Sequence, residues 1–162
     1  GRAVADIARG FGMEIHYHNR SRLPENLEKG AIFHEQLKGL LSQSEFLSIN
    51  CPGGKDNTNL LNKETLKYLP DGAVVANAAR GEIINDKDML DAIRVGKVFA
   101  LGLDVYNGEP QINDEYLKLN NLFLLPHLGS ATKKTRIAMG ERAINNLDQF
   151  LNKSVKPNDQ VN

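Results

Sequence analysis

Three polar side chains that could bind an acid and transfer a proton each follow an apolar segment of the chain. They are Arg80, Glu109 and His127, and the apolar segments before them span residues 73–79, 98–105 and 122–126. Each segment reads as a buried strand, and in open α/β sheets ligands bind beyond the carboxyl ends of the strands. We therefore expect the arginine, the carboxylate and the histidine to lie in one crevice, although they are far apart in the sequence.

The elements that must position these side chains alternate between helix and strand. Helical spacing of apolar residues predicts helices over 2–11, 35–42, 63–68 and 86–94, and from a cap at Ser130 or Thr132 to Leu151. Short apolar or alternating runs predict strands over 13–18, 46–49, 73–77, 98–104 and 122–125. This order predicts a doubly wound α/β fold (Rossmann-type) whose parallel sheet is covered on both faces. In the last helix, we expect a stripe of apolar residues to join the core: Ile137, Ile144, Leu147 and Leu151.

The start of the chain has the order of a dinucleotide-binding unit. Gly1 opens the first helix, a strand follows, and a polar cluster begins at Asn19. In the G-x-G-x-x-G fingerprint the third glycine allows the helix to pack closely on the strand, and Gly1 is placed to be that glycine. We therefore expect residues 1–151 to form a dinucleotide-binding domain whose first strand precedes Gly1, with a polar tail over 152–162.

The polar cluster after the second strand favours one cofactor. A carboxylate at that position bonds the ribose 2′-hydroxyl of NAD(H). This chain has Asn19, Arg20, Ser21 and Arg22 there instead. Arginine binds phosphate through charge-assisted paired hydrogen bonds, so the cluster favours the 2′-phosphate of NADP(H). Binding of NAD(H) stays open, as does a solvated turn without a ligand.

Composition limits the partners of the chain. Its 162 residues carry 20 basic and 20 acidic side chains, which argues against a nucleic-acid or membrane surface as the main partner. Cys51 is the only cysteine, which suits a reducing cytoplasm, and it reads as a packed side chain rather than a nucleophile. His16, His18 and His34 read as structural, and we expect no metal site.

Three motifs, in this order, resemble those of the D-2-hydroxyacid dehydrogenases. They are NAARG (77–81), GLDVYNGEP (102–110) and LPHLGS (125–130). The resemblance covers nearly the whole chain to about Leu151, and within the family it is strongest to the glyoxylate/hydroxypyruvate reductases. Members have a substrate domain and an inserted cofactor domain, and this chain resembles the cofactor domain alone.

The resemblance implies a role for each matching residue. Arg80 would hold the substrate carboxylate, His127 would be the general acid in reduction, and Glu109 would pair with the other ring nitrogen of His127. Asp104 would bind the nicotinamide carboxamide. The other cofactor-binding residues that it implies are Gly1, Asn19, Arg20, Ser21, Arg22, Cys51, Pro52, Ala78 and Gly129. Gly53, Gly54 and Asn57 stand where relatives often carry a bulkier residue and a threonine, so this loop departs from the family pattern.

The implied function is hydride transfer between NADP(H) and a small 2-keto or 2-hydroxy acid such as glyoxylate or hydroxypyruvate. The resemblance also implies a homodimer. Because the substrate domain is absent, we expect these residues alone to be inactive. Two alternatives stay open: an NAD-dependent dehydrogenase of phosphoglycerate or D-lactate, and a non-catalytic dinucleotide sensor related to corepressors. Formate dehydrogenases carry a glutamine where this chain has Glu109, which counts against that activity.

Overall fold

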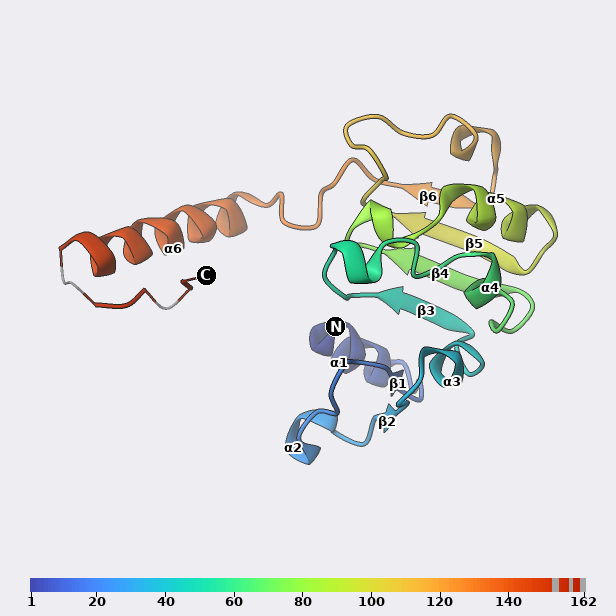
Figure 1. The fold of residues 1–162 in the computed structure, drawn as a ribbon, viewed down its shortest axis with the longest axis horizontal. Helices are drawn as coiled ribbons and strands as arrows, with labels where there is room; N and C mark the ends of the chain where they lie inside the picture. Colours follow the sequence, from blue (N-terminus) through green and yellow to red (C-terminus); the bar gives the residue numbers. More distant parts are fainter. Residues whose placement is uncertain (153–154, 158, 161–162) are drawn as a thin grey trace. The chain divides into compact units, whose positions relative to one another are not determined.

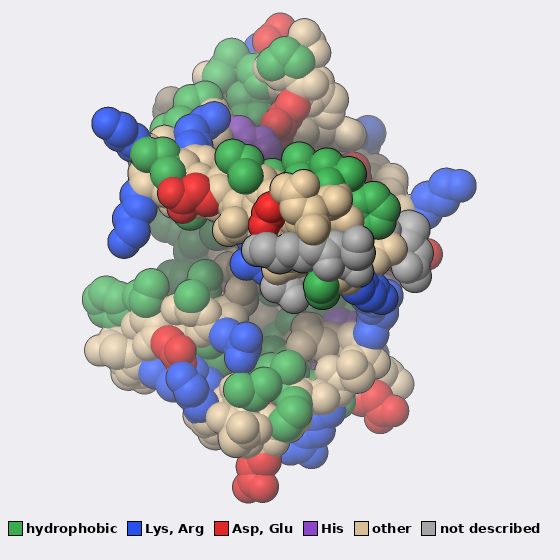
Figure 2. All heavy atoms as spheres, turned by 90° about the vertical axis from the view of Figure 1, so that its left-hand side faces the viewer, with side chains coloured by type: hydrophobic (Ala, Val, Ile, Leu, Met, Phe, Trp, Pro, Cys, Tyr) green, Lys and Arg blue, Asp and Glu red, His purple; other side chains and the backbone are tan. Residues whose placement is uncertain are grey.

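The computed structural model describes residues 1–152, 155–157 and 159–160 of the chain. It divides into two compact units, Gly1–Pro126 and His127–Asn162, which are described separately. Among the described residues, no helix is both long enough and apolar enough to cross a membrane. Both basic and acidic side chains are visible at the surface in Figure 2.

The larger unit is built on parallel strands (Figure 1). A sheet of four has the order β3-β4-β5-β6, and a separate pair joins β1 to β2. The strand bounds are β1 His16–Tyr17, β2 Ile32–Phe33, β3 Phe46–Ile49, β4 Ala73–Asn77, β5 Val98–Leu103 and β6 Leu122–Leu124. The predicted α/β class with a parallel, Rossmann-like sheet is confirmed. A central strand before Gly1 stays a prediction.

Helices connect the strands of this unit. Their bounds are α1 Arg2–Gly10, α2 Glu25–Glu28, α3 Leu37–Leu41, α4 Lys63–Leu66 and α5 Asp86–Arg94, with 3₁₀ turns at Lys55–Asn57, Gly81–Ile83 and Tyr116–Lys118. Asparagine caps fix two of them: the Asn62 side chain accepts from the Thr65 amide at 3.2 Å, and Asn85 accepts from the Asp88 amide at 3.1 Å. The helix α5 therefore begins at the predicted residue.

The core lies on one face of the four-stranded sheet. Leu47, Val75 and Leu101 are paired in register and buried there, and α4 and α5 lie over the sheet (Figure 1). Strand side chains alternate between faces, so Phe46 and Phe123 belong to the opposite face. They are 62% and 67% exposed. The prediction of cover on both faces is therefore met on one face only by the described residues.

The smaller unit contains α6, Lys133–Leu151. Thr132 caps it by accepting from the Thr135 amide at 3.2 Å, which selects Thr132 over Ser130 as the cap. No described residue of α6 is buried, and Ile144 in the apolar stripe is 66% exposed. Within the smaller unit nothing buries this stripe, and its packing against the core stays a prediction. Apolar periodicity indicates which face of a helix is suited to burial, but it does not supply the partner.

Candidate active site

The predicted site residues of the larger unit follow the carboxyl ends of its parallel strands. Asn19–Arg22 follow β1, Cys51 and Pro52 follow β3, Ala78 and Arg80 follow β4, and Asp104 and Glu109 follow β5. Parallel strands end at the same edge of a sheet, so the structure brings the residues after β3, β4 and β5 to one edge.

A buried asparagine shapes the turn that carries Arg80. Asn77, the last residue of β4, is 2% exposed. Its Nδ2 donates to the Arg80 carbonyl at 2.8 Å, and its Oδ1 accepts from the Ala79 amide at 3.0 Å. Both hydrogen bonds are local, so Asn77 closes the turn on itself and directs Arg80 out of the sheet. The Arg80 side chain is exposed, as binding of a substrate carboxylate requires.

Gly81 lets this turn pack against the segment that leads to Glu109. A Cβ atom at Gly81 would lie 1.9 Å from the carbonyl carbon of Tyr106 and 2.3 Å from the amide nitrogen of Asn107. Only a residue without a side chain fits against backbone at that distance. The glycine after Arg80 therefore brings the Arg80 turn and the loop after β5 into direct contact.

The loop after β5 is held by its own carboxylate and by a tyrosine. Glu109 Oε1 accepts from the Tyr106 amide at 2.8 Å. The Tyr106 hydroxyl donates to the Leu125 carbonyl at 2.7 Å, beyond the end of β6. Burial, followed by the charge of Asp104, raises the pKa of Tyr106, so this hydroxyl stays a donor at neutral pH. The same loop thus holds Glu109 and contacts the chain two residues before His127.

His127 adopts an uncommon backbone conformation. Its φ is +55°, in the left-handed region that non-glycine residues seldom occupy. Such conformations cost free energy and cluster at functional sites, so the observation supports a functional role for His127. His127 belongs to the smaller unit, and its pairing with Glu109 stays a prediction.

The glycine loop after β3 packs against the Arg80 side chain. A Cβ atom at Gly53 would lie 2.9 Å from Arg80 Cγ and 2.3 Å from Glu82 Oε1. The Gly54 amide donates to the same Glu82 oxygen at 3.3 Å. The small residues that depart from the family pattern therefore leave room for Arg80 and Glu82. Cys51 in this loop is half-buried, and burial raises the pKa of its thiol, so the thiolate is disfavoured.

The start of α1 fits the phosphates of a dinucleotide. Gly1 is the N-cap of α1 and no side chain caps the helix, so its first amides are not satisfied by a capping group. Such amides bind anions. A Cβ atom at Gly1 would lie 3.4 Å from Asn50 Cβ, just after β3, so the helix start approaches the end of that strand closely. The described residues thus fit a dinucleotide, and the place of Gly1 at its phosphates stays a prediction.

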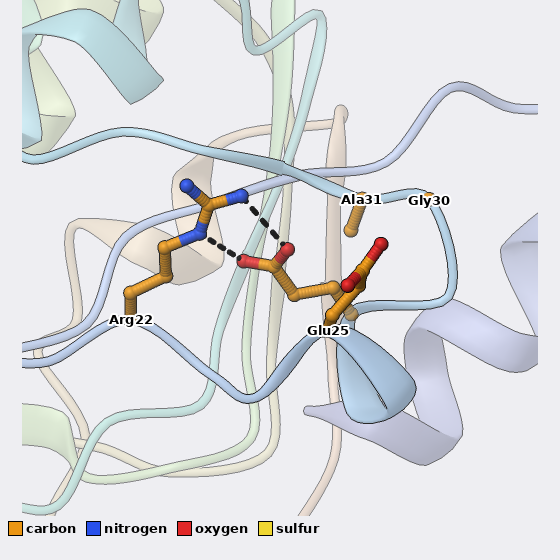
Figure 3. A pocket seen from close by; sticks show the side chains of 5 residues that line it. Arg22, Glu25, Gly30 and Ala31 are labelled. Carbon is orange, nitrogen blue, oxygen red and sulfur yellow. Dashed lines mark hydrogen bonds and ion pairs between the residues drawn. The ribbon is translucent and has the colours of Figure 1, made fainter.

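The two arginines in the loop after β1, Arg20 and Arg22, differ in their hydrogen-bond partners. Arg22 is bound by Glu28 through two hydrogen bonds, Nε to Oε1 at 2.8 Å and Nη2 to Oε2 at 3.0 Å (Figure 3). Among the described residues, no side-chain hydrogen bond or ion pair of Arg20 is found. Asn19, Arg20 and Ser21 are exposed. Within the described chain, Arg20 is therefore the arginine of this loop whose guanidinium has no side-chain partner.

The pairing of Glu28 predicts a stability change in acid. Hydrogen bonds from Arg22 and then Tyr17 lower the pKa of Glu28 from 4.5 to about 2. Because the folded-state pKa is lowered, this stabilisation is fully present above the unfolded value and is lost as the pH falls from 4.5 towards 2. In urea unfolding, Glu28→Gln should therefore lower the free energy of unfolding, relative to the parent, by more at pH 7 than at pH 3. An equal loss at both pH values would contradict this assignment.

The histidines near β1 form a structural group. His16 Nδ1 lies 2.8 Å from His34 Nε2, and His16 Nε2 lies 2.6 Å from Glu14 Oε1. His18 Nδ1 lies 2.9 Å from the His34 carbonyl oxygen. These contacts join β1 to the residue after β2. Within the part of the chain that the structure describes, no group of three or more histidine, cysteine or acidic side chains could hold a metal ion.

Comparison with known proteins decides the family. The NAD-binding-domain model of the D-isomer specific 2-hydroxyacid dehydrogenases matches residues 1–129. The chain belongs to this family. The family predicted from the three motifs is thereby confirmed, and the parallel sheet described above belongs to its NAD-binding domain.

Individual relatives are similar over nearly the whole chain. The glyoxylate reductase of Thermococcus kodakarensis is 42% identical over 97% of this chain and 47% of its own length. The glycerate dehydrogenase of Hyphomicrobium methylovorum is 40% identical over 91% of this chain and 47% of its own. This D-2-hydroxyacid dehydrogenase chain therefore spans about half the length of these relatives.

A solved structure is similar in fold as well. The NADPH-dependent glyoxylate/hydroxypyruvate reductase of Sinorhizobium meliloti, in complex with NADP and malonate, has a TM-score of 0.86 and 31% identity. The match covers 93% of this chain and 46% of that one.

Sequence reasoning missed several residues that build the site: Glu28, Tyr17, Asn77, Gly81 and Tyr106. Asn77 carried a signal, because a polar residue that ends an apolar strand must find local partners. Gly81 carried a weaker one, as a glycine directly after Arg80. Glu28 carried none, since nothing in its spacing distinguishes it from the exposed Glu25 on the same helix.

Proposed function

We propose that the full-length protein is an NADP(H)-dependent reductase of small 2-keto acids such as glyoxylate or hydroxypyruvate. The observation that carries the proposal is the contact at Gly81, which joins the Arg80 turn to the loop of Glu109 at the carboxyl edge of the sheet. The names of the relatives, glyoxylate reductase and glyoxylate/hydroxypyruvate reductase, support the substrate class. We further propose that the protein is a cytoplasmic homodimer.

The chemistry assigns a task to each polar group. Arg80 holds the substrate carboxylate through a planar pair of hydrogen bonds, which fixes the keto carbon for attack. The bound dinucleotide supplies the hydride. His127 acts as the general acid and gives a proton to the carbonyl oxygen as negative charge develops there. Glu109 accepts from the far ring nitrogen, which fixes the tautomer and the orientation of the ring.

The remaining residues hold the cofactor. Gly1 and the first amides of α1 bind its phosphates, and Asp104 and the Ala78 backbone face the nicotinamide. Cys51 and Pro52 flank the adenine, and Gly129 also contributes to cofactor binding. Asn19, Arg20, Ser21 and Arg22 form the surroundings of the 2′-phosphate. A carboxylate that would bond the ribose 2′-hydroxyl of NAD(H) is absent from these four positions, which favours NADP(H).

Arg20 is expected to carry most of the discrimination between the two cofactors. Replacing it with alanine should raise the KM for NADPH by about tenfold, the scale of one charge-assisted hydrogen bond, and leave the KM for NADH nearly unchanged. Steady-state kinetics of Arg20→Ala with both cofactors measures this. Lys87→Ala, which removes an exposed charge on α5, is the control. Equal losses with NADPH and NADH would show that Arg20 does not recognise the 2′-phosphate.

The first test of the function is oxidation of NADPH and of NADH by the full-length protein with glyoxylate, hydroxypyruvate and pyruvate. Turnover with NADPH preferred would support the proposal. Turnover with NADH preferred would keep the site and overturn the cofactor. Tight cofactor binding without turnover of any pair would favour a dinucleotide sensor instead.

Glycerate or phosphoglycerate oxidation with NAD is the second candidate. The 40% identity to a glycerate dehydrogenase favours it, because glycerate is the product of hydroxypyruvate reduction. The same assay run in reverse compares NAD with NADP on D-glycerate, D-3-phosphoglycerate and D-lactate. A preference for NAD, or turnover of D-3-phosphoglycerate or D-lactate above that of D-glycerate, would favour the second candidate.

A further inference from the structure

The loop that would bind the ribose end of the cofactor is attached to one buried carboxylate. Glu28, at the end of α2, is 6% exposed although it is acidic. A buried charge is costly unless it is paired and hydrogen-bonded, so a carboxylate in this position requires several partners.

Two partners reach the carboxylate, one from β1 and one from the loop that follows it. Arg22 supplies the paired hydrogen bonds drawn in Figure 3, and the Tyr17 hydroxyl of β1 donates to Glu28 Oε1. Tyr17 in turn accepts from the Leu23 amide at 3.0 Å. The Glu28 carbonyl accepts from Arg9 Nη2 at 2.8 Å, which connects the end of α2 to α1.

The result is a short turn fixed at both ends. On one side, His18 Nδ1 lies 2.9 Å from the His34 carbonyl oxygen. On the other side, Glu28 holds Arg22, and Tyr17 holds the Leu23 amide. The residues between these attachments are Asn19, Arg20 and Ser21, and all three are exposed.

We propose that Glu28 is a positioning residue for cofactor binding: by holding Arg22 and Tyr17 it fixes the turn Asn19–Ser21 in the shape that binds the adenosine ribose. This inference rests on the proposed function, which assigns that turn to the ribose and its 2′-phosphate. Arg22 then acts mainly through its contact with Glu28, and only its Nη1 can also donate to the ligand. Arg20 binds the phosphate directly.

The loss of the charge of Glu28 and the loss of its positioning role should change the affinity for the anionic ligand in opposite directions. Removal of a carboxylate beside an anionic ligand would strengthen anion binding if charge alone mattered. Loss of position would weaken binding, because a site that is held loosely pays to order its groups when the ligand arrives. The sign of the effect therefore separates the two causes.

The test is calorimetric titration of the full-length protein with adenosine 2′,5′-bisphosphate and with AMP. For Glu28→Gln, we expect binding of the bisphosphate to weaken by about tenfold. Tyr17→Phe removes one attachment with no change in charge, so it should weaken binding in the same direction. In kinetics, the KM for the cofactor should rise in both variants while kcat at saturation stays unchanged, which a general loss of structure would not produce.

Glu25→Gln is the matched control, because it makes the same charge change on the same helix. Glu25 lines the same pocket as Arg22 and Glu28 (Figure 3), but its side chain is exposed. Binding by Glu25→Gln should equal or slightly exceed that of the parent. Unchanged or tighter binding by Glu28→Gln, or weakening equal to that in Glu25→Gln, would overturn the proposal. If the parent binds AMP as tightly as the bisphosphate, the NADP(H) assignment fails. The role of Glu28 is then decided separately by comparing the dissociation constants for AMP of Glu28→Gln and of the parent.

Discussion

Replacing His127 with glutamine in the full-length protein is expected to lower kcat by about 10²–10⁴-fold, the usual contribution of a general acid. Glutamine keeps a hydrogen-bond donor of similar reach, but it cannot release a proton near neutral pH. The developing negative charge on the substrate oxygen would then have a polar neighbour and no acid. Binding of adenosine 2′,5′-bisphosphate should change little, since His127 is assigned to the substrate and not to the adenosine.

The matched control for that variant is His16→Gln. It also removes an imidazole. The ring nitrogens of His16 contact Glu14, which precedes β1, and His34, which follows β2. His16→Gln should lower stability and leave kcat at saturating cofactor nearly unchanged. Steady-state kinetics on both variants gives the comparison, and a kcat near that of the parent in His127→Gln would remove the assigned role.

The strands of the larger sheet were predictable because their signal is local. The apolar runs at β3 and β4 are bounded by polar and turn residues, and their observed bounds agree with the prediction. The strand predicted over 13–18 is reduced to His16–Tyr17, because β2, its only partner among the described residues, offers just Ile32 and Phe33. The elements α2 and β2 have four and two residues, too few for any periodic pattern to indicate them.

The candidate site was predictable to the same depth. Arg80 and Glu109 follow strands, so the rule for parallel sheets places them at one edge. The attachments that fix them do not follow from local sequence. Glu28 binds Arg22 and Tyr17 because the end of α2 lies within hydrogen-bond reach of β1 and of the loop after it. The missing Cβ of Gly81 matters only because the Tyr106 backbone lies against it. Both depend on which segments meet in space.

Gly81→Ala is expected to cost about 3 kcal/mol of unfolding free energy, the upper range for overpacking a tight site. The added Cβ would lie 1.9 Å from a backbone carbon of Tyr106, so no rotamer change can relieve the contact and the loop must move. That movement would displace the Tyr106 amide that Glu109 accepts from, together with the Tyr106 hydroxyl that donates to Leu125. Stability and kcat/KM should therefore fall together, as measured by urea unfolding and steady-state kinetics.

Gly102→Ala provides the contrast, because Gly102 lies on β5, the strand that leads into the same loop. A Cβ there would lie 4.0 Å from Ala76 Cβ, an ordinary van der Waals distance. Alanine also restricts the unfolded chain more than glycine does, which stabilises a compatible site by about 0.4–1 kcal/mol. Gly102→Ala should thus be neutral or slightly stabilising. If Gly81→Ala and Gly102→Ala lowered the free energy of unfolding equally, the loss would reflect the general effect of replacing a glycine in this region. The close approach of Gly81 to Tyr106 would then not explain how the Arg80 turn and the Glu109 loop are held together.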